Sequence, residues 1–163
     1  MTAHKASSVL RQQEKGFWGT LSGMTVSAGL GKVWSALSGG SPRLLDLNVV
    51  QARCTLVHYD YIGLQTVPLS QICGSASAGR CHDFDASFRP LHDHNEGRWT
   101  AVSTARRKGV KLPPVSLIKV GEVYFVEDGH HRISVAKARG EQTIEAEVVV
   151  WQVSPELQLR ADS

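Results

Sequence analysis

Cysteine is scarce in this sequence, which holds only Cys54, Cys73 and Cys81 among its 163 residues. A small protein held together by disulfides carries a denser, even-numbered set of cysteines. A disulfide scaffold is therefore excluded, and a reducing, intracellular setting is expected.

Long apolar runs are also missing, and none is long enough to cross a bilayer. The segment Phe17–Leu37 comes closest, but glycine, serine and Lys32 interrupt it. The opening residues Met1–Ala6 are not followed by the short apolar core of a secretory signal. We therefore expect a cytoplasmic protein without a transmembrane segment.

Several common site motifs are absent as well. The sequence has no phosphate-binding P-loop, no dinucleotide Gly-x-Gly-x-x-Gly pattern and no nucleophile elbow of a serine hydrolase. A structural zinc site needs closely spaced cysteine or histidine pairs. That spacing is not found in the local set Cys73, Cys81, His82, His92 and His94. No metal ligand is assigned.

Charge of either sign is modest, with a formal net charge of +3. This value tolerates an anionic ligand, but a nucleic-acid-binding domain usually carries a denser basic patch. DNA is therefore the more weakly supported partner.

The composition changes at a cluster of chain-breaking residues, Gly39–Pro42. We expect an extension over residues 1–43, a folded domain over 44–151 and a tail over 152–163. One face of a helix in the extension would carry Val26, Leu30, Val33, Trp34 and Leu37. Three interpretations of this extension stay open. It could be a helix docked on the domain, a helix over residues 17–37 that binds a membrane surface, a protein partner or a second copy of the chain, or an organelle-targeting leader.

Hydrophobic periodicity and chain breakers predict the order of elements in the domain. The first part is expected to contain a helix over Leu44–Val57, a loop at Tyr59–Gly63, a strand over Leu64–Leu69, a loop over Gly74–Pro90 and a helix over Asn95–Lys108. The last part is expected to contain strands over Val115–Val120 and Val123–Glu127, a helix over His131–Arg139 ended by Gly140, and a strand over Ile144–Trp151. Gly121-Glu122 suits a type II′ hairpin turn, and Pro68 suggests the edge or the end of a strand.

The pentapeptide Asp128-Gly129-His130-His131-Arg132 is the strongest functional signal. It connects an apolar strand to a helix, and the first N–H groups of a helix have no partner within it. These amides and the helix dipole favour an anion, Gly129 removes a Cβ that would hold a phosphate away, and His130, His131 and Arg132 add donors. Asp128 could cap the helix or hold a metal ion. An ordinary Asp-Gly turn with two surface histidines is the alternative.

In this context the pentapeptide, followed by Gly140 and an apolar strand, resembles the core of the ParB/sulfiredoxin superfamily. The segments Val67–Ile72 and Lys111–Lys119 are similar to the opening strand and the pre-hairpin segment of ParB N-terminal domains. The resemblance covers roughly Leu64 to Trp151. It implies a small α+β fold, a mixed sheet with packed helices, that binds nucleotide phosphates at this turn.

Branches of this superfamily differ in activity. Sulfiredoxins carry a catalytic cysteine where this chain has His130, so reduction of a sulfinic acid is not expected. Partition proteins continue into a helix-turn-helix domain for DNA, and the residues after Trp151 are too few for one. Free-serine kinases have a turn similar to Asp128–Arg132 and transfer phosphate to a small hydroxyl substrate.

The resulting hypothesis is a nucleotide-binding, ParB-like regulatory or partition-related module without its own helix-turn-helix domain. A nucleoside di- or triphosphate with Mg²⁺ is the expected cofactor. The alternatives are a small ATP- or ADP-dependent phosphotransferase and a DNA-associated protein. An enzyme would need a carboxylate base, for which the candidates are Asp83, Asp85 and Glu127, and Arg80 is an additional phosphate-binding candidate. Trp99 and Trp151 are expected in the core.

Overall fold

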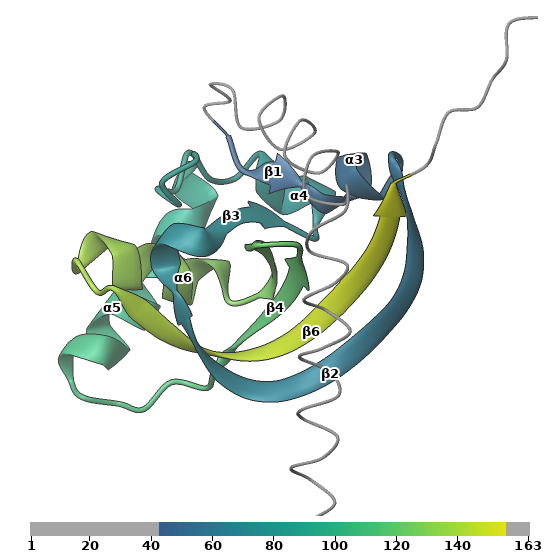
Figure 1. The fold of residues 1–163 in the computed structure, drawn as a ribbon. Coiled ribbons are helices and arrows are strands. Elements are labelled where there is room, and N and C mark those ends of the chain that lie inside the picture. Colours follow the sequence, from purple (N-terminus) through teal and green to yellow (C-terminus); the bar gives the residue numbers. More distant parts are fainter. Residues whose placement is uncertain (1–42, 156–163) are drawn as a thin grey trace, which may run out of the picture. The chain divides into compact units, whose positions relative to one another are not determined.

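Six strands form one mixed sheet in the order β1-β3-β5-β4-β6-β2 (Figure 1). The structure, a computed structural model, describes residues 43–155. The strands are β1 Leu45–Asp46, β2 Cys54–Pro68, β3 Ile72–Ser75, β4 Val115–Val120, β5 Val123–Asp128 and β6 Thr143–Pro155. The helices are α3 Leu47–Gln51, α4 Ala78–Cys81, α5 Glu96–Arg107 and α6 His130–Ala138, with short 3₁₀ helices η1 Leu69–Gln71 and η2 Asp93–Asn95. The expected α+β class is confirmed.

The strand directions bring two functional segments to the same edge of the sheet. β3 runs parallel to β1 and to β5, while the hairpin partner β4 is antiparallel to β5. The register of β3 and β5 pairs Ser75 with Val126, so the carboxyl ends of both strands lie together. The segments that leave these two ends, Ala76–Arg80 and Gly129–His131, therefore start from neighbouring points.

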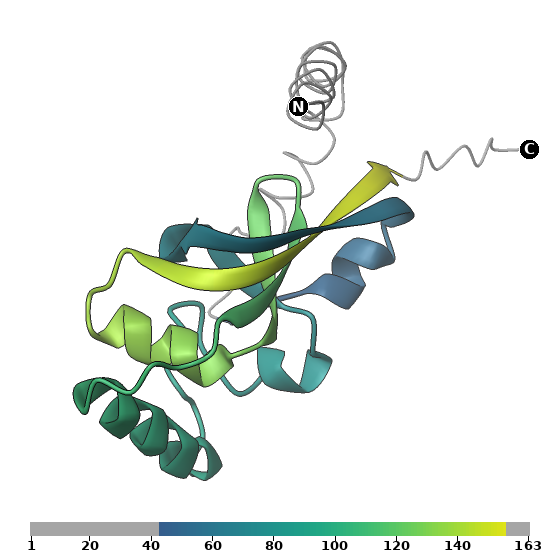
Figure 2. The same ribbon diagram turned by 90° about the horizontal axis from the view of Figure 1, so that it is seen from below.

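The two longer helices lie on one side of the sheet as successive layers, with α5 beyond α6 (Figure 2). α6 contributes Ile133 and Ala136 to the main apolar core. α5 is attached to α6 through polar contacts, because the indole Nε1 of Trp99 donates to Ser134 Oγ at 3.0 Å. The main core consists of Leu44, Val67, Leu69, Ile72, Phe84, Phe88, Val115, Leu117, Val126, Ile133, Ala136, Ile144, Ala146 and Val148.

The expected helix over Leu44–Val57 is wrong for most of its length. Only Leu47–Gln51 is helical, and it starts where the Asp46 carboxylate accepts the Asn48 N–H at 2.9 Å. From Cys54 onward the chain pairs with β6, about 90 residues later in the sequence. Pairing with a distant strand has overridden a local pattern that fitted a helix.

The expected loop at Tyr59–Gly63 is also wrong, because these residues lie in the middle of β2. Two register shifts against β6, between Leu56 and His58 and between Tyr61 and Gly63, break the regular alternation of the strand. Pro68 is the last residue of β2, and β2 is an edge strand, as expected. The loop expected over Gly74–Pro90 contains the end of β3 and the short helix α4.

The second half of the domain agrees closely with the sequence analysis. α5, β4, β5 and α6 each lie within one or two residues of the expected bounds. Gly121, at the β4–β5 turn, has a φ of 60°, which the first position of a type II′ turn requires. β6 continues to Pro155, past the expected end at Trp151. Trp99 and Trp151 are half-buried and not part of the main core.

Within residues 43–155, every helix is too short or too polar to cross a bilayer. The helical stripe expected between Val26 and Leu37, and most of the expected tail, lie outside the described residues.

The close contact of β3 with its neighbours predicts the effect of one substitution. A Cβ on Gly74 would lie 2.5 Å from Phe125 Cδ1 and 2.6 Å from the Leu45 carbonyl oxygen. We expect Gly74→Ala to lower the free energy of unfolding by about 1–3 kcal/mol, measured by urea denaturation. Gly97→Ala is the matched control, because it lies in α5 with open space around it and should stabilise the protein by up to about 1 kcal/mol. Equal effects of the two substitutions would contradict this packing.

Candidate functional site

The turn from β5 into α6 depends on Gly129. This residue has a φ of 104°, in the left-handed region that other residues rarely adopt. A Cβ at this position would lie 2.5 Å from Val115 Cγ1 of β4. The glycine expected here is therefore required by close packing against the sheet, in addition to any room that it leaves for a ligand.

The N-terminus of α6 has no side-chain cap among the described residues. The first helical hydrogen bond of this turn runs from the Ile133 N–H to the Gly129 carbonyl at 3.0 Å, so the amides of His130, His131 and Arg132 precede the regular ladder. The expected capping role of Asp128 is wrong, since its largely exposed carboxylate instead pairs with Arg132. These three amides and the helix dipole form a partially positive surface at this end of α6.

Arg132 has a different role from the one expected. Its Nη1 donates to the carbonyl oxygens of Pro113 and Pro114, each at 2.7 Å, and its Nη2 donates to Asp128 Oδ2 at 2.5 Å. The guanidinium is therefore used to fasten α6 to the segment that leads into β4. We assign Arg132 to holding the turn, and the expected fork on a phosphate is not the arrangement in this structure.

His130 is buried, and it joins α6 to β3. Its Nε2 lies 2.8 Å from Ser75 Oγ, and its ring stacks on Phe84 with centroids 5.8 Å apart. Burial, with further contributions from Arg80 and His131, lowers the pKa of His130 from 6.5 to about 4. His130 is thus neutral at pH 7 and bonded within the protein, so the donor that it offers at the helix terminus is its backbone amide.

His131 is the unusual member of the turn. Its side chain is 9% exposed, and neither ring nitrogen has a hydrogen-bond partner among the described residues. Its ring meets Phe84 edge-on, with centroids 5.2 Å apart. Burial, followed by the charges of Arg80 and Arg98, lowers the pKa of His131. Buried polar groups are nearly always paired, so this imidazole is the clearest sign of a binding site in the domain.

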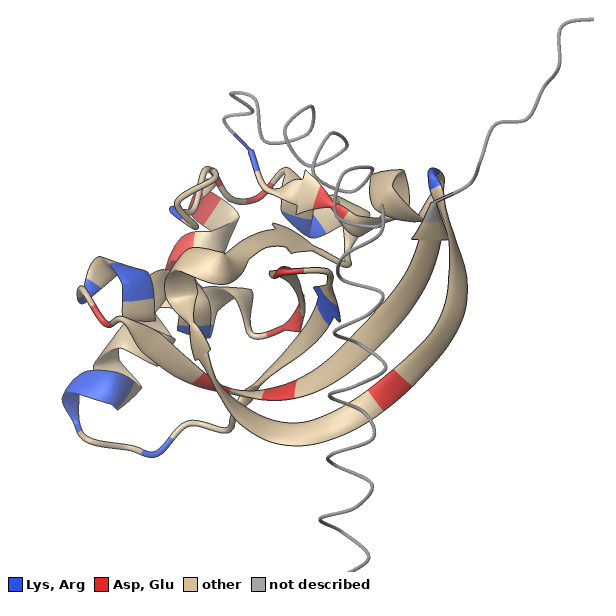
Figure 3. Cartoon of the chain, in the orientation of Figure 1, with Lys and Arg blue, Asp and Glu red and all other residues tan. Residues whose placement is uncertain are grey.

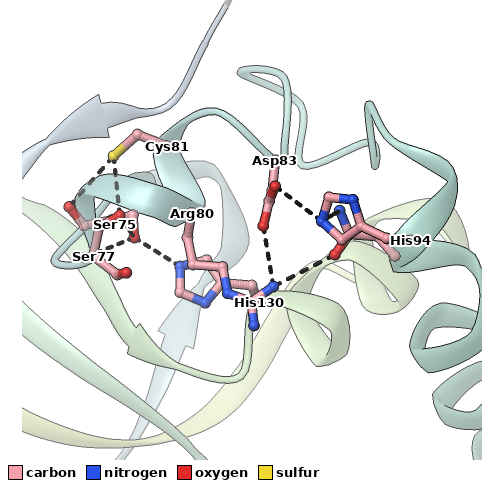
Figure 4. Close-up of polar contacts among 8 residues, drawn as sticks. Ser75, Ser77, Arg80, Cys81, Asp83, His94 and His130 are labelled. Atoms are coloured by element: carbon pink, nitrogen blue, oxygen red, sulfur yellow. Dashed lines mark hydrogen bonds and ion pairs between the residues drawn. The ribbon is translucent and has the colours of Figure 1, made fainter.

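A polar network formed by residues of α4, of η2 and of the loop between them lies beside His130 (Figure 4). Arg80 Nη1 donates to Asp83 Oδ2 at 3.1 Å and to Asn95 Oδ1 at 3.4 Å. His94 Nε2 lies 3.2 Å from Asp83 Oδ1 and 3.2 Å from Asn95 Nδ2. We call Arg80, Asp83, His94, Asn95 and His131 the polar cluster.

The cluster includes three residues expected from the sequence, Arg80, Asp83 and His131, and two that sequence reasoning does not find. Arg80 and Asp83 were candidates for phosphate binding and for a catalytic base, and the structure brings them next to the turn. Asn95 is 1% exposed, but the sequence predicts for it only the start of a helix, and it places His94 only in the set that lacks the spacing of a zinc site. A short 3₁₀ helix places both, and such a helix has no periodic signal in the sequence.

The other two carboxylate candidates lie outside the cluster. Asp85 Oδ1 accepts the N–H groups of Ser87 and Arg89, each at 2.8 Å, so this carboxylate stabilises its own loop. Glu127 is exposed near the end of β5. Of the three candidate bases, only Asp83 is close to the histidines.

Thiolate chemistry is disfavoured near the site. The Cys81 thiol is buried, with its Sγ 3.5 Å from the Leu45 carbonyl oxygen. Burial, followed by the charge of Asp46, raises the pKa of Cys81 to about 11. Burial also raises the pKa of Cys73. Both thiols therefore stay protonated at neutral pH, and a protonated thiol is a weak nucleophile.

Metal ligands form no obvious centre in the described part of the chain. Within residues 43–155, no group of three or more His, Cys, Asp or Glu side chains is arranged to hold a metal ion.

Comparisons with known proteins give a likeness of structure and no match of family. No family model matches the chain, and no curated protein matches it. Among solved structures the chain is similar to sulfiredoxin from Arabidopsis thaliana, with 20% sequence identity and a TM-score of 0.38. The match covers 52% of this chain and 82% of that chain. A likeness at this level gives the chain no family name and assigns no activity.

The burial of His130 predicts a pH-dependent stability. Its pKa is 6.5 in the unfolded chain and about 4 in the folded domain, so the unfolded chain binds more protons between these values. The contribution of His130 to the free energy of unfolding is therefore fully present above the pKa of the unfolded chain, 6.5, and decreases as the pH falls toward the folded pKa of about 4. The contribution of His130 is roughly 3 kcal/mol, measurable by urea denaturation across this range. His130→Leu should remove most of the dependence and leave the part contributed by His131, whose pKa is also lowered, whereas substitution of the exposed His58 by asparagine should leave it unchanged. A wild-type protein of constant stability over this range would show that His130 is not buried.

The contacts of Arg132 predict a structural effect in the absence of any ligand. We expect Arg132→Ala to lower the free energy of unfolding by about 2–4 kcal/mol, because two carbonyl groups lose charge-assisted hydrogen bonds. Arg132→Lys should recover only part of this loss, since one ammonium group lacks the planar fork. Arg139→Ala, on the same helix with a half-exposed side chain, should change stability by less than about 0.5 kcal/mol. Identical melting curves for Arg132→Ala and the wild type would refute the role assigned to Arg132.

Proposed function

We propose that this domain binds the phosphate groups of a nucleotide at the N-terminus of α6 and acts as a nucleotide-binding regulatory module. The observation that carries the proposal is the buried His131 imidazole, whose ring nitrogens have no partner among the described residues, next to an uncapped helix terminus. An oxygen-rich anion would supply acceptors for both the imidazole N–H and the helix amides.

The charges around His131 favour an anion. Arg80 and Arg98 both lower the pKa of His131, which means that the potential at the imidazole is raised by two cations. Asp83 opposes them only in part, and His94 lowers the pKa of His131 in the same direction as the two arginines. The positive end of the α6 dipole adds to the cations. A phosphate is therefore attracted to the place where the unpaired imidazole lies.

Arg80 is the side chain best placed to reach a phosphate. Its contacts with Asp83 and Asn95 both use Nη1, so in the described part of the chain the opposite side of its guanidinium is available for a further anion. Its side chain is 31% exposed, which allows it to contact a ligand from solvent while it remains held by Asp83. In this proposal Arg80 takes the role that the sequence suggested for Arg132.

One observation favours an enzymatic alternative. Asp83 is largely buried beside Arg80 and His94, and it lies close enough to influence both His130 and His131. A carboxylate in this position could accept the proton of a substrate hydroxyl during phosphoryl transfer. This alternative requires nucleotide consumption in the presence of a small alcohol, with loss of turnover in Asp83→Asn and retained nucleotide binding.

The binding proposal is tested with the full chain and a panel of inorganic phosphate, ADP, ATP, CTP and GTP, each with and without Mg²⁺. A ligand at about a hundred times its dissociation constant should raise the free energy of unfolding by about 2.7 kcal/mol, which thermal denaturation detects. Arg80→Ala should weaken the best ligand by about 10–100-fold, measured by isothermal titration calorimetry. Arg107→Ala is the control: Arg107 is exposed at the C-terminal end of α5, and its loss should leave the affinity unchanged.

His131→Leu separates binding from folding. Leucine has a similar volume and no polar atom, so it removes two buried unpaired nitrogens and should leave the unliganded protein as stable as the wild type or more stable. The same substitution should weaken nucleotide binding by about tenfold or more, because the imidazole donor is lost. If no phosphate compound binds, or if His131→Leu binds as tightly as the wild type, the proposed site is wrong.

A further inference from the structure

β2 and β6 present an apolar face that points away from the main core. In β6, Ala146 and Val148 belong to the core, so the alternate residues Val149 and Trp151 face the other way. The register pairs Trp151 with Tyr59 and Val149 with Tyr61, and paired residues lie on the same face of a sheet. We call Leu56, Tyr59, Tyr61, Leu64, Val149 and Trp151 the outer face.

The large side chains of β2 in the outer face are strongly exposed. The exposed fractions are 65% for Tyr59, 66% for Tyr61 and 58% for Leu64. A single exposed apolar residue is ordinary on a protein surface, but a contiguous aromatic and aliphatic group marks an interaction site. Tyrosine and tryptophan are also the residues that contribute most to protein interfaces.

β2 offers an unpaired backbone edge along the same surface. In the described part of the chain it pairs only with β6, over a strand of 15 residues. Natural edge strands usually discourage pairing with lysine, arginine or proline. Neither β2 nor β6 contains a lysine or an arginine, and the proline of β2 comes only at its last position, Pro68. Two bulges, between Leu56 and His58 and between Tyr61 and Gly63, divide this edge into shorter regular segments.

The charge of this surface is negative. The two strands carry Glu145 and Glu147 on the outer face, Asp60 on the opposite face and no permanent cation; Figure 3 shows the acidic positions of the long curved pair. Glu147 lies opposite Leu64 in the register and is exposed. An anionic membrane or a nucleic acid would be repelled by this surface, and two copies of it would bring carboxylates of the same sign together. A basic partner is attracted.

We propose that the free edge of β2 and the outer face bind an extended segment of a protein partner in which apolar residues alternate with lysine or arginine. The segment adds a strand to β2 through backbone hydrogen bonds. Its apolar side chains cover Tyr59 and Tyr61, and the cations that alternate with them point to the opposite face of the sheet, on which the register places Asp60. This interaction is independent of the phosphate site, because it uses other strands and other side chains.

The test uses the full chain and three fluorescein-labelled peptides of nine residues: alternating lysine and valine, alternating glutamate and valine, and alternating lysine and serine. Fluorescence anisotropy should show that the lysine–valine peptide binds at least about tenfold more tightly than either of the others, with affinity that falls as salt rises. Hydrogen exchange should show new protection of amides in β2 and none in β4.

Matched variants locate the interaction. Tyr61→Ser and Leu64→Ser should each weaken the lysine–valine peptide, whereas Val110→Ser should not, although Val110 is 54% exposed in the loop before β4. Equal binding of the glutamate–valine peptide, no binding of any peptide, or protection outside β2 would each overturn the proposal. So would a concentration-dependent dimer that Tyr61→Ser abolishes, because the outer face would then belong to a second copy of the chain.

Discussion

The contact of Gly129 with Val115 determines the geometry of the domain around the candidate site. With a φ of 104° and no Cβ, this residue lets the chain leave β5 and start α6 directly against β4. The same turn places His130 in contact with Ser75 and Phe84. It also places the first amides of α6 next to the carboxyl ends of β3 and β5. Arg132 then fixes the turn through the carbonyl groups of Pro113 and Pro114. The site therefore depends on a junction of β4, β5 and α6 that is fully constrained by packing.

The parts of the fold that the sequence predicts well are those whose contacts are local. The hairpin at Gly121 and the helix after Gly129 are specified by glycine positions and by short apolar runs, and both were located within two residues. Only the end of β2 agrees with the predicted strand Leu64–Leu69; the rest is not predictable because its partner, β6, is remote in the sequence and because two bulges hide its alternation. In the site, the turn itself was predictable, but the direction of the Arg132 side chain and the approach of Asn95 depend on tertiary packing that no local pattern encodes.

The two histidines of the turn are buried to a similar extent, but they differ in hydrogen bonding. His130 is hydrogen-bonded to Ser75 and is neutral, as a structural histidine should be. His131 is almost as buried, but its ring nitrogens are unpaired in the described part of the chain, an arrangement that lowers stability in the absence of a ligand. Residues at functional positions often lower the stability of the unliganded protein. This contrast between neighbours, more than the motif itself, distinguishes a binding site from an ordinary strand–turn–helix junction.

The long pairing of β2 with β6 also has a consequence for the order in which the protein can fold. β2 is synthesised well before its only partner strand among the described residues, Thr143–Pro155. A contact over so large a sequence separation closes slowly, because the loop entropy of the intervening chain has to be overcome first. During translation the tyrosines and aliphatic residues of β2 therefore remain without their partner strand for the whole synthesis of the domain, and this interval is when the nascent chain is most exposed to aggregation or to binding by a chaperone.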